Sequence, residues 1–399
     1  MRILMISDTY FPRISGVATS IQSFRHGLQG LGHTVDLIIP DYGSELSEDS
    51  GITRIPSWST RFYPEERLMQ PLALLRLRRA LQHRQYDLVH IQTPFIAHYS
   101  GHYLARFLRV PLISSYHTYF EAYLGHYYAG IPAFLRKMLI RLPSRQQAAA
   151  VNGMIVPSMA VAKVLWGYGI KTPIQVIPTG IDLTRPRTGD RRMFRQRLGI
   201  RANQPTLLYA GRIAPEKNIA LLLEMLVALR ADFPDILLLL AGDGPSRETL
   251  ERAARQRALM DHVRFLGYLD RETALLDAYA GADLLVFASE SETQGMVLLE
   301  ALAAGLPIVA VPAMGAADVL SSGLGTRSVP AEASAFADAC SRLLKDESLR
   351  QQLAGEARAL AEQWSEPMMV KRLEKFYRQT LAGEIVEATS PSSKVPRVD

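Results

Sequence analysis

Two glutamates eight residues apart, Glu292 and Glu300, have the residue type and spacing to bind the hydroxyl groups of a ligand. Between them lie Gly295 and Met296, where a polar loop gives way to an apolar run typical of a helix. Glu300 is the only charged residue of that run, and a buried carboxylate is costly unless it accepts hydrogen bonds. We therefore expect Glu300 to find donors either in the protein or on a ligand.

Ribose hydroxyls are suitable donors to such a carboxylate, as they are for the acidic residue of dinucleotide-binding folds. The free backbone amides at the helix start, near Gly295 and Met296, could bind a diphosphate. Glu292 would then contact the far end of the same ligand. The alternative for Glu300 is structural, a buried carboxylate that caps a neighbouring loop. Because Glu300→Gln relieves a buried charge, the sequence alone predicts unchanged or higher thermal stability for this variant.

Arg212 and Lys217 form a second candidate site, because they follow a predicted strand that ends at Gly211. Arginine binds phosphate oxygens through two N–H groups, and lysine supplies a point charge to a leaving diphosphate. No Gly-Lys-Ser/Thr sequence follows, which argues against a P-loop. Read as isolated cations, the two could equally be ordinary surface residues.

Two further candidates lie in the first half of the chain. Gly16 follows the first predicted strand, and a glycine there would let backbone amides approach a phosphate. His117 ends a predicted central strand, where a buried, hydrogen-bonded histidine is the competing interpretation.

The sequence gives little support for a metal site. His98 and His102 are four residues apart on a predicted helix, but no third ligand is evident. No Asp-x-Asp pair, which could hold Mn²⁺ or Mg²⁺ on a nucleotide diphosphate, occurs anywhere. We expect no metal and no cofactor.

Short apolar runs alternate with segments of helical period along the whole chain, the pattern of βαβ units and parallel sheets. The predicted strands are residues 2–8, 34–40, 52–56, 87–92, 111–116, 153–157 and 174–178, then 206–210, 236–241, 263–267, 283–288, 307–311 and 326–329. We predict an α/β protein of two doubly wound, Rossmann-like domains facing each other across a ligand-binding cleft.

The domain limits follow from this pattern and from the length of 399 residues. We place the domains at residues 1–185 and 186–365, joined by a polar, basic linker that runs to about Gln204. A helix over 366–381 is predicted to pack back on the first domain, and a flexible tail over 382–399 is predicted to follow.

The net charge of +6 is unevenly distributed. Residues 67–145 hold eleven basic and two acidic side chains, with leucines among the arginines at helical spacing in the segments 67–81 and 134–141. Such segments could lie on an anionic membrane surface, or they could be core helices with a solvated basic rim. No RNP-type aromatic motif or zinc finger supports nucleic-acid binding.

A cytoplasmic location is expected from two features. Cys340 is the only cysteine, so no intrachain disulfide can form, and the first apolar run has four residues, too few for a secretory signal. A longer apolar run, 296–317, is interrupted by Gly-Leu-Pro and predicts helix, turn and strand rather than a membrane span.

The segment from Glu292 to Pro307, with its E-x7-E spacing, resembles the retaining GT-B glycosyltransferases of family 4 (group 1). The resemblance covers nearly the whole chain and is firmest from Thr206 to Pro312. The Thr-Gln-Gly form of the loop and the Tyr-His-Thr-Tyr-Phe-Glu stretch at 116–121 are similar to bacterial enzymes that add glucose or mannose to diacylglycerol or related lipids. Many relatives have Gly-Gly where this chain has Ser-Gly, which ends at Gly16.

The resemblance implies a role for each candidate. Glu292 would contact the donor hexose and Glu300 the nucleotide ribose, while Arg212 and Lys217 would bind the donor diphosphate and His117 would lie beside the donor sugar. The first domain would bind the acceptor and the second the nucleotide sugar.

The implied activity is retaining, metal-independent transfer of a hexose, with glucose favoured, from a nucleotide-diphosphate sugar to a membrane lipid such as diacylglycerol. It would take place at the inner face of the cytoplasmic membrane. A GDP-mannose-dependent mannosyltransferase, an enzyme with a soluble sugar acceptor and a sugar-nucleotide epimerase of the same fold are the alternatives. The epimerase would need additional acid/base carboxylates.

Overall fold

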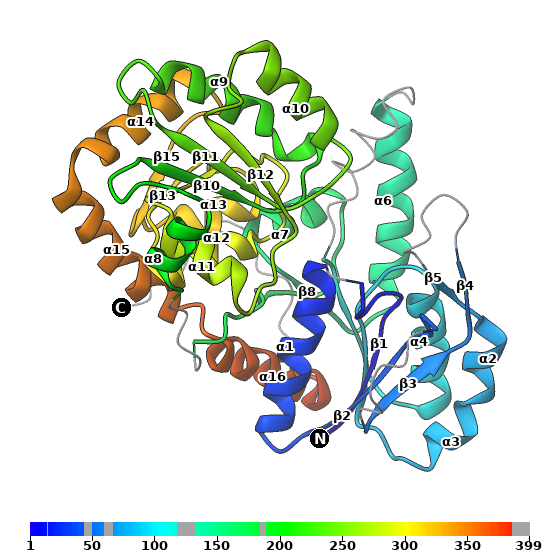
Figure 1. Cartoon of the computed structure of the whole chain (residues 1–399). Coiled ribbons are helices and arrows are strands. Elements are labelled where there is room, and N and C mark those ends of the chain that lie inside the picture. Colours follow the sequence, from blue (N-terminus) through cyan, green and yellow to red (C-terminus); the bar gives the residue numbers. More distant parts are fainter. Residues whose placement is uncertain (14, 44–49, 60–66, 118–132, 184–188, 385–399) are drawn as a thin grey trace. The chain divides into compact units, whose positions relative to one another are not determined.

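The computed structural model describes residues 1–399 except 14, 44–49, 60–66, 118–132, 184–188 and 385–399 (Figure 1). The chain divides into two compact units. The described residues within 1–117, 133–180 and 366–384 form the first unit, and those within 181–365 form the second. Each unit is a parallel sheet with helices on both faces, so the predicted class of two doubly wound α/β domains is confirmed. The predicted domain boundary at 185/186 and most of the predicted tail lie outside the described residues.

The sheet of the first unit has the order β3-β2-β1-β6-β7-β8-β9, and all its strands are parallel. Its strands are β1 (Arg2–Ile6), β2 (Thr34–Pro40), β3 (Ile52–Ile55), β6 (Leu88–Ile91), β7 (Leu112–Ser115), β8 (Gly153–Val156) and β9 (Ile174–Val176). The central strands are buried on both faces, which is why they read as continuous apolar runs. The strand order reverses between β1 and β6, and ligands of doubly wound folds bind at such a switch point.

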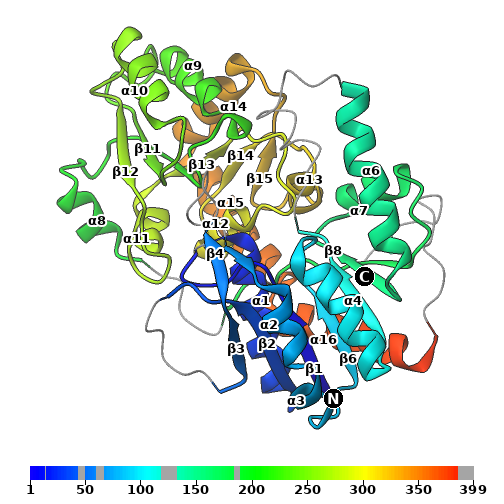
Figure 2. The same ribbon diagram turned by 90° about the vertical axis from the view of Figure 1, so that its right-hand side faces the viewer.

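Helices cover both faces of this sheet. They are α1 (Gly16–Gly30), α2 (Pro71–Arg76), α3 (Arg78–Gln82), α4 (Ile96–Leu108), α6 (Ala133–Ala149), α7 (Met159–Gly167) and α16 (Glu366–Ala382). The last helix, α16, lies alongside α1 in both views (Figures 1 and 2). The two approach closely at Gly27, where an added Cβ would lie 2.3 Å from Cγ2 of Val370. Ser23 also donates a hydrogen bond of 2.9 Å to Glu366. These contacts attach the end of the described chain to the first unit.

One small element of the first unit differs from the prediction. Strand β4 (Ser57–Ser59) pairs antiparallel with β5 (Arg67–Met69), so the segment 67–81 is not helical throughout. The helix starts at Pro71, a residue suited to the first helical position because it lacks an N–H group. Two three-residue strands carry too little alternation to be recognised from sequence.

The second unit has a six-stranded parallel sheet in the order β12-β11-β10-β13-β14-β15. Its strands are β10 (Thr206–Ala210), β11 (Leu237–Ala241), β12 (Val263–Gly267), β13 (Leu284–Phe287), β14 (Ile308–Ala310) and β15 (Thr326–Ser328). All thirteen predicted strands are therefore present.

Its helices are α8 (Arg191–Arg197), the 3-10 turn η1 (Pro215–Lys217), α9 (Ile219–Leu229), α10 (Arg247–Gln256), α11 (Ala274–Gly281), α12 (Met296–Ala304), α13 (Gly315–Leu320), α14 (Ala333–Lys345) and α15 (Glu347–Glu362). Helices α9, α10 and α14 cover one face of the sheet, and α11, α12 and α15 the other (Figure 1). Among the described residues, no helix is both long enough and apolar enough to cross a membrane.

Helix α8 lies in the stretch that the sequence predicted as a linker, and it is packed. Phe194 is buried against Gly281, where an added Cβ would lie 2.2 Å from the ring. The Arg195 guanidinium is also buried, and it donates to the backbone carbonyls of Gly281 and Gln204 and to the Asp283 carboxylate. Because this stretch is rich in arginine, the sequence did not indicate a helix, although α8 is packed against the second unit.

Candidate active site

The edge of the second sheet where β10 and β11 end is held together by backbone contacts. Gly211 donates a 2.9 Å hydrogen bond to Ala241, and Ile213 donates one of the same length to Asp243. A Cβ at Gly242, whose φ is +137°, would lie 1.9 Å from the Gly211 carbonyl oxygen. Only glycine fits there, so the two loops that follow these strands have fixed shapes.

Lys217 and Glu292 meet at this edge. The Lys217 Nζ lies 2.6 Å from the Glu292 carboxylate, and both side chains are only about one-fifth exposed. Lys217 follows β10 and Glu292 follows the neighbouring strand β13, so the pair joins two adjacent strand ends. Arg212 lies in the same loop as Lys217, but its side chain is exposed. The structure thus brings together Lys217, a residue predicted to bind the diphosphate, and Glu292, a residue predicted to bind the hexose.

The start of α12 is built around Gly295. This residue caps the helix with φ +85°, and Met296 is the first helical residue. The preceding loop is fixed from outside, because Gly315 donates a 2.7 Å hydrogen bond to the Glu292 carbonyl and packs directly on Thr293. The first backbone amides of α12 therefore follow a loop of fixed shape. Free amides at the start of a helix bind anions in other proteins.

Glu300 is 3% exposed, and both of its carboxylate oxygens have protein partners. Tyr279 donates a hydrogen bond of 2.9 Å to Oε2, and the Arg271 guanidinium forms an ion pair with Oε1. Of the two kinds of donor that the sequence left open, the structure shows protein donors. A contact between Glu300 and a ribose stays a prediction.

Sequence reasoning missed Arg271 and Tyr279. Arg271 lies in a short turn after β12. Asp270 sets the shape of this turn by accepting hydrogen bonds from the backbone amide and the hydroxyl of Thr273. The Asp-Arg-Glu-Thr sequence of this turn is a capping signal, and it could have indicated an ordered loop. It could not have shown that the arginine reaches Glu300.

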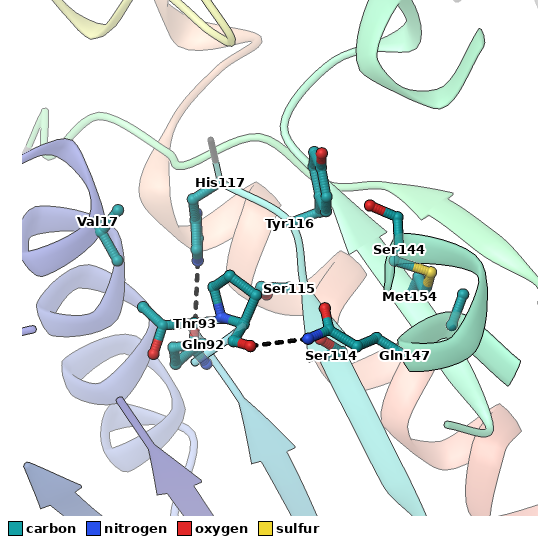
Figure 3. Close-up of a pocket in the computed structure, with 12 residues that line it drawn as sticks. Val17, Gln92, Thr93, Ser114, Ser115, Tyr116, His117, Ser144, Gln147 and Met154 are labelled. Atoms are coloured by element: carbon teal, nitrogen blue, oxygen red, sulfur yellow. Dashed lines mark hydrogen bonds between the residues drawn. The ribbon is translucent and has the colours of Figure 1, made fainter. Parts of the chain in front are cut away.

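In the first unit, a pocket is lined by His117 together with side chains that follow β6 and belong to β7, β8 and α6 (Figure 3). The His117 Nε2 lies 3.1 Å from Oε1 of Gln92. Enclosure of the ring lowers the pKa of His117 to about 4, so the imidazole is neutral at neutral pH. His117 is thus a hydrogen-bonded histidine that also faces a pocket.

Gly16 opens α1, and the N-cap of that helix is Ser15, whose hydroxyl accepts from the Ala18 amide at 3.1 Å. A Cβ at Gly16 would meet nothing within 4 Å, so the fold itself does not require glycine there. A phosphate contact at Gly16 stays a prediction.

Asp8, at the switch point of the first sheet, was missed by sequence reasoning. Its carboxylate accepts hydrogen bonds from the Thr93 hydroxyl (2.7 Å) and from the Ala97 amide at the start of α4 (3.0 Å). Burial raises the pKa of Asp8 to about 6 in spite of these bonds. Asp8 fastens the end of β1 to the loop after β6. In the described part of the chain, no group of three or more histidine, cysteine or acidic side chains is placed to hold a metal.

A cationic loop and an acidic loop at adjacent strand ends, on one of two doubly wound units, agree with the GT-B glycosyltransferases that the sequence resembles. The family model for glycosyl transferases group 1 matches residues 190–360, and that for Glycosyltransferase Family 4 matches residues 14–185. The chain therefore belongs to glycosyltransferase family 4, and the resemblance stated from the E-x7-E segment is confirmed.

Relatives with assigned activities support the same family. The chain is 37% identical to an alpha-monoglucosyldiacylglycerol synthase of Streptococcus pneumoniae, over 78% of this chain and 71% of that one. It is 30% identical to the Acholeplasma laidlawii enzyme of the same name, over 77% and 80%. A GDP-mannose-dependent alpha-mannosyltransferase of Mycobacterium tuberculosis is 29% identical over 80% and 81%.

Solved structures share the fold. Anabaena HepE in complex with UDP superposes with a TM-score of 0.77 at 18% identity, over 95% of this chain and all of that one. Sucrose-phosphate synthase from Thermosynechococcus elongatus superposes with a TM-score of 0.76 at 22% identity, over 96% and 99%.

The Arg271–Glu300 pair reverses the stability expected for Glu300→Gln. The substitution leaves the Arg271 cation without its anion, so we expect the free energy of unfolding to fall by about 1–3 kcal/mol, less than for a fully buried pair because Arg271 is partly exposed. Urea unfolding measures this, with the exposed neighbour Glu290→Gln as the control. In the double variant Glu300→Gln/Arg271→Met, part of the loss should be recovered. A Glu300→Gln variant as stable as the parent would show that the pair contributes nothing.

Buried histidines predict an acid-sensitive fold. Burial lowers the pKa of His90 to about 3 and of His98 and His117 to about 4, whereas an unfolded histidine has a pKa of about 6.5. Between those values the unfolded chain binds more protons, so stability is lost as the pH falls from about 6.5 to about 4. His98→Gln should lower the slope of unfolding free energy against pH by up to about 1.4 kcal/mol per pH unit.

The matched control for this measurement is His26→Gln, because His26 is exposed on α1. Asp8 has a raised pKa and opposes the histidines in the same pH range, but it is present in every variant and cancels in the comparison. Equal slopes for the parent and His98→Gln would contradict the prediction.

Proposed function

We propose that this glycosyltransferase moves a hexose, with glucose favoured, from a nucleotide-diphosphate sugar to a membrane lipid such as diacylglycerol, with retention of the anomeric configuration. The observation that carries the proposal is the contact between Lys217 and Glu292, which sets a cation for the leaving diphosphate beside a carboxylate for the hexose. Two relatives named as alpha-monoglucosyldiacylglycerol synthases support the choice of sugar and acceptor. The mannosyltransferase relatives keep GDP-mannose as the alternative donor.

Donor binding would exchange the ion pair for ligand contacts. Lys217 and Arg212 would bind the diphosphate, and Glu292, released from Lys217, would accept hydrogen bonds from hexose hydroxyls. Glu300 could accept from ribose hydroxyls without giving up Arg271, because a carboxylate has about four lone-pair sites and has two partners among the residues that the structure describes.

In the proposed reaction, the bond between the anomeric carbon and the diphosphate oxygen breaks. The acceptor hydroxyl forms the new bond on the same face of the sugar, and its proton passes to the leaving phosphate. Positive charge at Arg212 and Lys217, together with the first amides of α12, stabilises the charge that develops on the diphosphate. His117, neutral at the pH of the reaction, would contact the transferred sugar by hydrogen bonding. These groups can meet the diphosphate charge without a metal.

The lipid acceptor is supported by the surface of the first unit. Large apolar side chains are exposed on the basic segment: Leu72 (71% exposed), Tyr99 (62%), Leu142 (57%), Leu139 (56%) and Phe95 (55%). Arg76 and Arg79 are exposed near Leu72, and Lys137 and Arg141 lie among the leucines of α6. Apolar and cationic side chains together favour an anionic membrane surface. We propose a peripheral position on the inner face of the cytoplasmic membrane.

The donor-site assignment predicts that Lys217→Ala reduces turnover by about 10²-fold or more, as for loss of a positioned electrostatic stabiliser. Transfer is measured with UDP-glucose and with GDP-mannose, each with and without diacylglycerol vesicles. Arg252→Ala, which removes an exposed cation from α10, is the control.

The same assay tests the metal and the stereochemistry. Activity should survive EDTA, and NMR of the anomeric proton should show an α-linked product. A β-linked product would contradict retention. Activity abolished by EDTA and restored by Mn²⁺ would contradict the metal-free mechanism.

The membrane proposal predicts binding to anionic vesicles that salt releases. The double variant Arg76→Glu/Arg79→Glu should bind them at least about 30-fold more weakly, because each cation near the surface contributes about 1 kcal/mol. Arg252→Glu/Arg255→Glu places the same change in charge on α10 of the second unit and is the matched control. Vesicle sedimentation with anionic and zwitterionic lipid measures the binding. Equal binding to both lipids, or to neither, would remove the support for an anionic membrane surface.

A further inference from the structure

A chain of hydrogen bonds inside the first unit leads from α16 to the ring of His117. The Tyr377 hydroxyl lies 2.6 Å from His90 Nδ1, and His90 Nε2 lies 2.8 Å from the Ser115 hydroxyl. The Gln92 amide nitrogen lies 3.0 Å from the same His90 Nδ1, and its oxygen lies 3.1 Å from His117 Nε2. Figure 3 shows the His117 ring pointing at Gln92 at the floor of the pocket.

The protons in this chain can be assigned from Tyr377. This side chain is completely buried, and burial raises its pKa, so its hydroxyl keeps its proton. Buried O–H groups in proteins are in the large majority hydrogen-bonded, and at 2.6 Å the Tyr377 hydroxyl has His90 Nδ1 as its only partner among the described residues, so we take it as the donor to that nitrogen. His90 Nδ1 is therefore a bare acceptor. Since burial also keeps the His90 ring neutral, its proton is on Nε2 and is donated to Ser115.

This assignment fixes the amide of Gln92. An acceptor at His90 Nδ1 requires the amide NH₂ group of Gln92 on that side, so the amide oxygen has to face His117. The oxygen can only accept, and His117 Nε2 must carry a proton. The remaining ring nitrogen of His117, Nδ1, then has a lone pair and no hydrogen-bond partner among the residues that the structure describes.

We propose that Gln92 and Tyr377 are positioning residues that hold His117 in its Nε2–H tautomer, so that Nδ1 accepts a hydrogen bond from a hydroxyl group of the transferred sugar. The proposal rests on the proposed function, which puts His117 beside that sugar. It assigns His117 the role of a neutral acceptor rather than that of a cation or a proton donor. It also means that the packing of α16 on the first unit affects the protonation of His117. Tyr377 lies on α16, and the proton of its hydroxyl sets the direction of every hydrogen bond from His90 to His117.

The tautomer can be read directly from ¹⁵N chemical shifts of histidine-labelled protein, with His117→Asn used to assign the signal. We expect a pure Nε2–H pattern in the parent and mixed tautomers in Gln92→Leu and in Tyr377→Phe, which keeps the ring but loses the hydroxyl. Gln147→Leu is the matched control, since Gln147 lines the same pocket but bonds to the Pro94 carbonyl. Its His117 shifts should match the parent.

Steady-state kinetics supply the second readout. Gln92→Leu should lower kcat by about 10-fold or more with a smaller change in the donor KM, as for partners that orient metal-bound histidines. Gln92→Glu should raise the pKa of His117, because a carboxylate stabilises the imidazolium, and should introduce an acid limb in the pH–rate profile that the parent lacks.

The outcomes separate this inference from the proposed function. Nδ1–H in the parent, or an unchanged tautomer in both Gln92→Leu and Tyr377→Phe, would overturn the inference whatever the activity. A parent with pure Nε2–H that transfers neither glucose nor mannose would leave the tautomer assignment standing and overturn the proposed function, and with it the role of Nδ1 toward the sugar.

Discussion

Parallel strands end where the chain leaves an apolar core, and any polar side chain placed at that point is partly cut off from water. Such a side chain has to find a partner, because an unpaired buried charge costs more than any single packing contact contributes. Three carboxylates of the two units, at or near the strand ends, are paired in this way. Asp8 is satisfied by Thr93 and the start of α4, Glu292 by Lys217, and Glu300 by Arg271 and Tyr279. The geometry of the candidate site is largely the outcome of these pairings.

The pairing of Lys217 with Glu292 also fixes the loops to which the proposed donor would bind. A loop that carried Lys217 alone would be drawn to solvent, and one that carried Glu292 alone would be repelled by a diphosphate. Paired at 2.6 Å, each holds the other at the sheet edge, and the loop–helix joint at Gly295 is fixed by Gly315. In the proposed function, the side chains of Lys217 and Glu292 would exchange partners while the backbone of their loops stays in place, which is the condition under which fixed charges are most effective in catalysis.

The sequence predicted the structure best where the pattern lies within a single strand or loop. All thirteen predicted strands are present, because buried parallel strands are continuous apolar runs, and the E-x7-E loop could be assigned to a family. Helix α8 escaped because arginines dominate it, and the β4–β5 pair escaped because its strands have only three residues each. The partners Arg271 and Tyr279 escaped for a different reason: each is an unremarkable residue until the fold brings it to Glu300.

The protonation of the histidine in the pocket also depends on residues that are distant in the sequence. His117 could be selected from the sequence because it ends a predicted strand and because the family resemblance implies a histidine beside the donor sugar. Its chemistry depends on which nitrogen is protonated, and this is decided by Gln92, His90 and Tyr377 in turn. His90 and Tyr377 are separated by 287 residues, so no local motif could have linked them. Donation by the buried Tyr377 hydroxyl to His90, together with the contacts of Gln92, is enough to order these hydrogen bonds. A helix at the end of the described fold can thereby determine whether a pocket offers a sugar an acceptor or a donor.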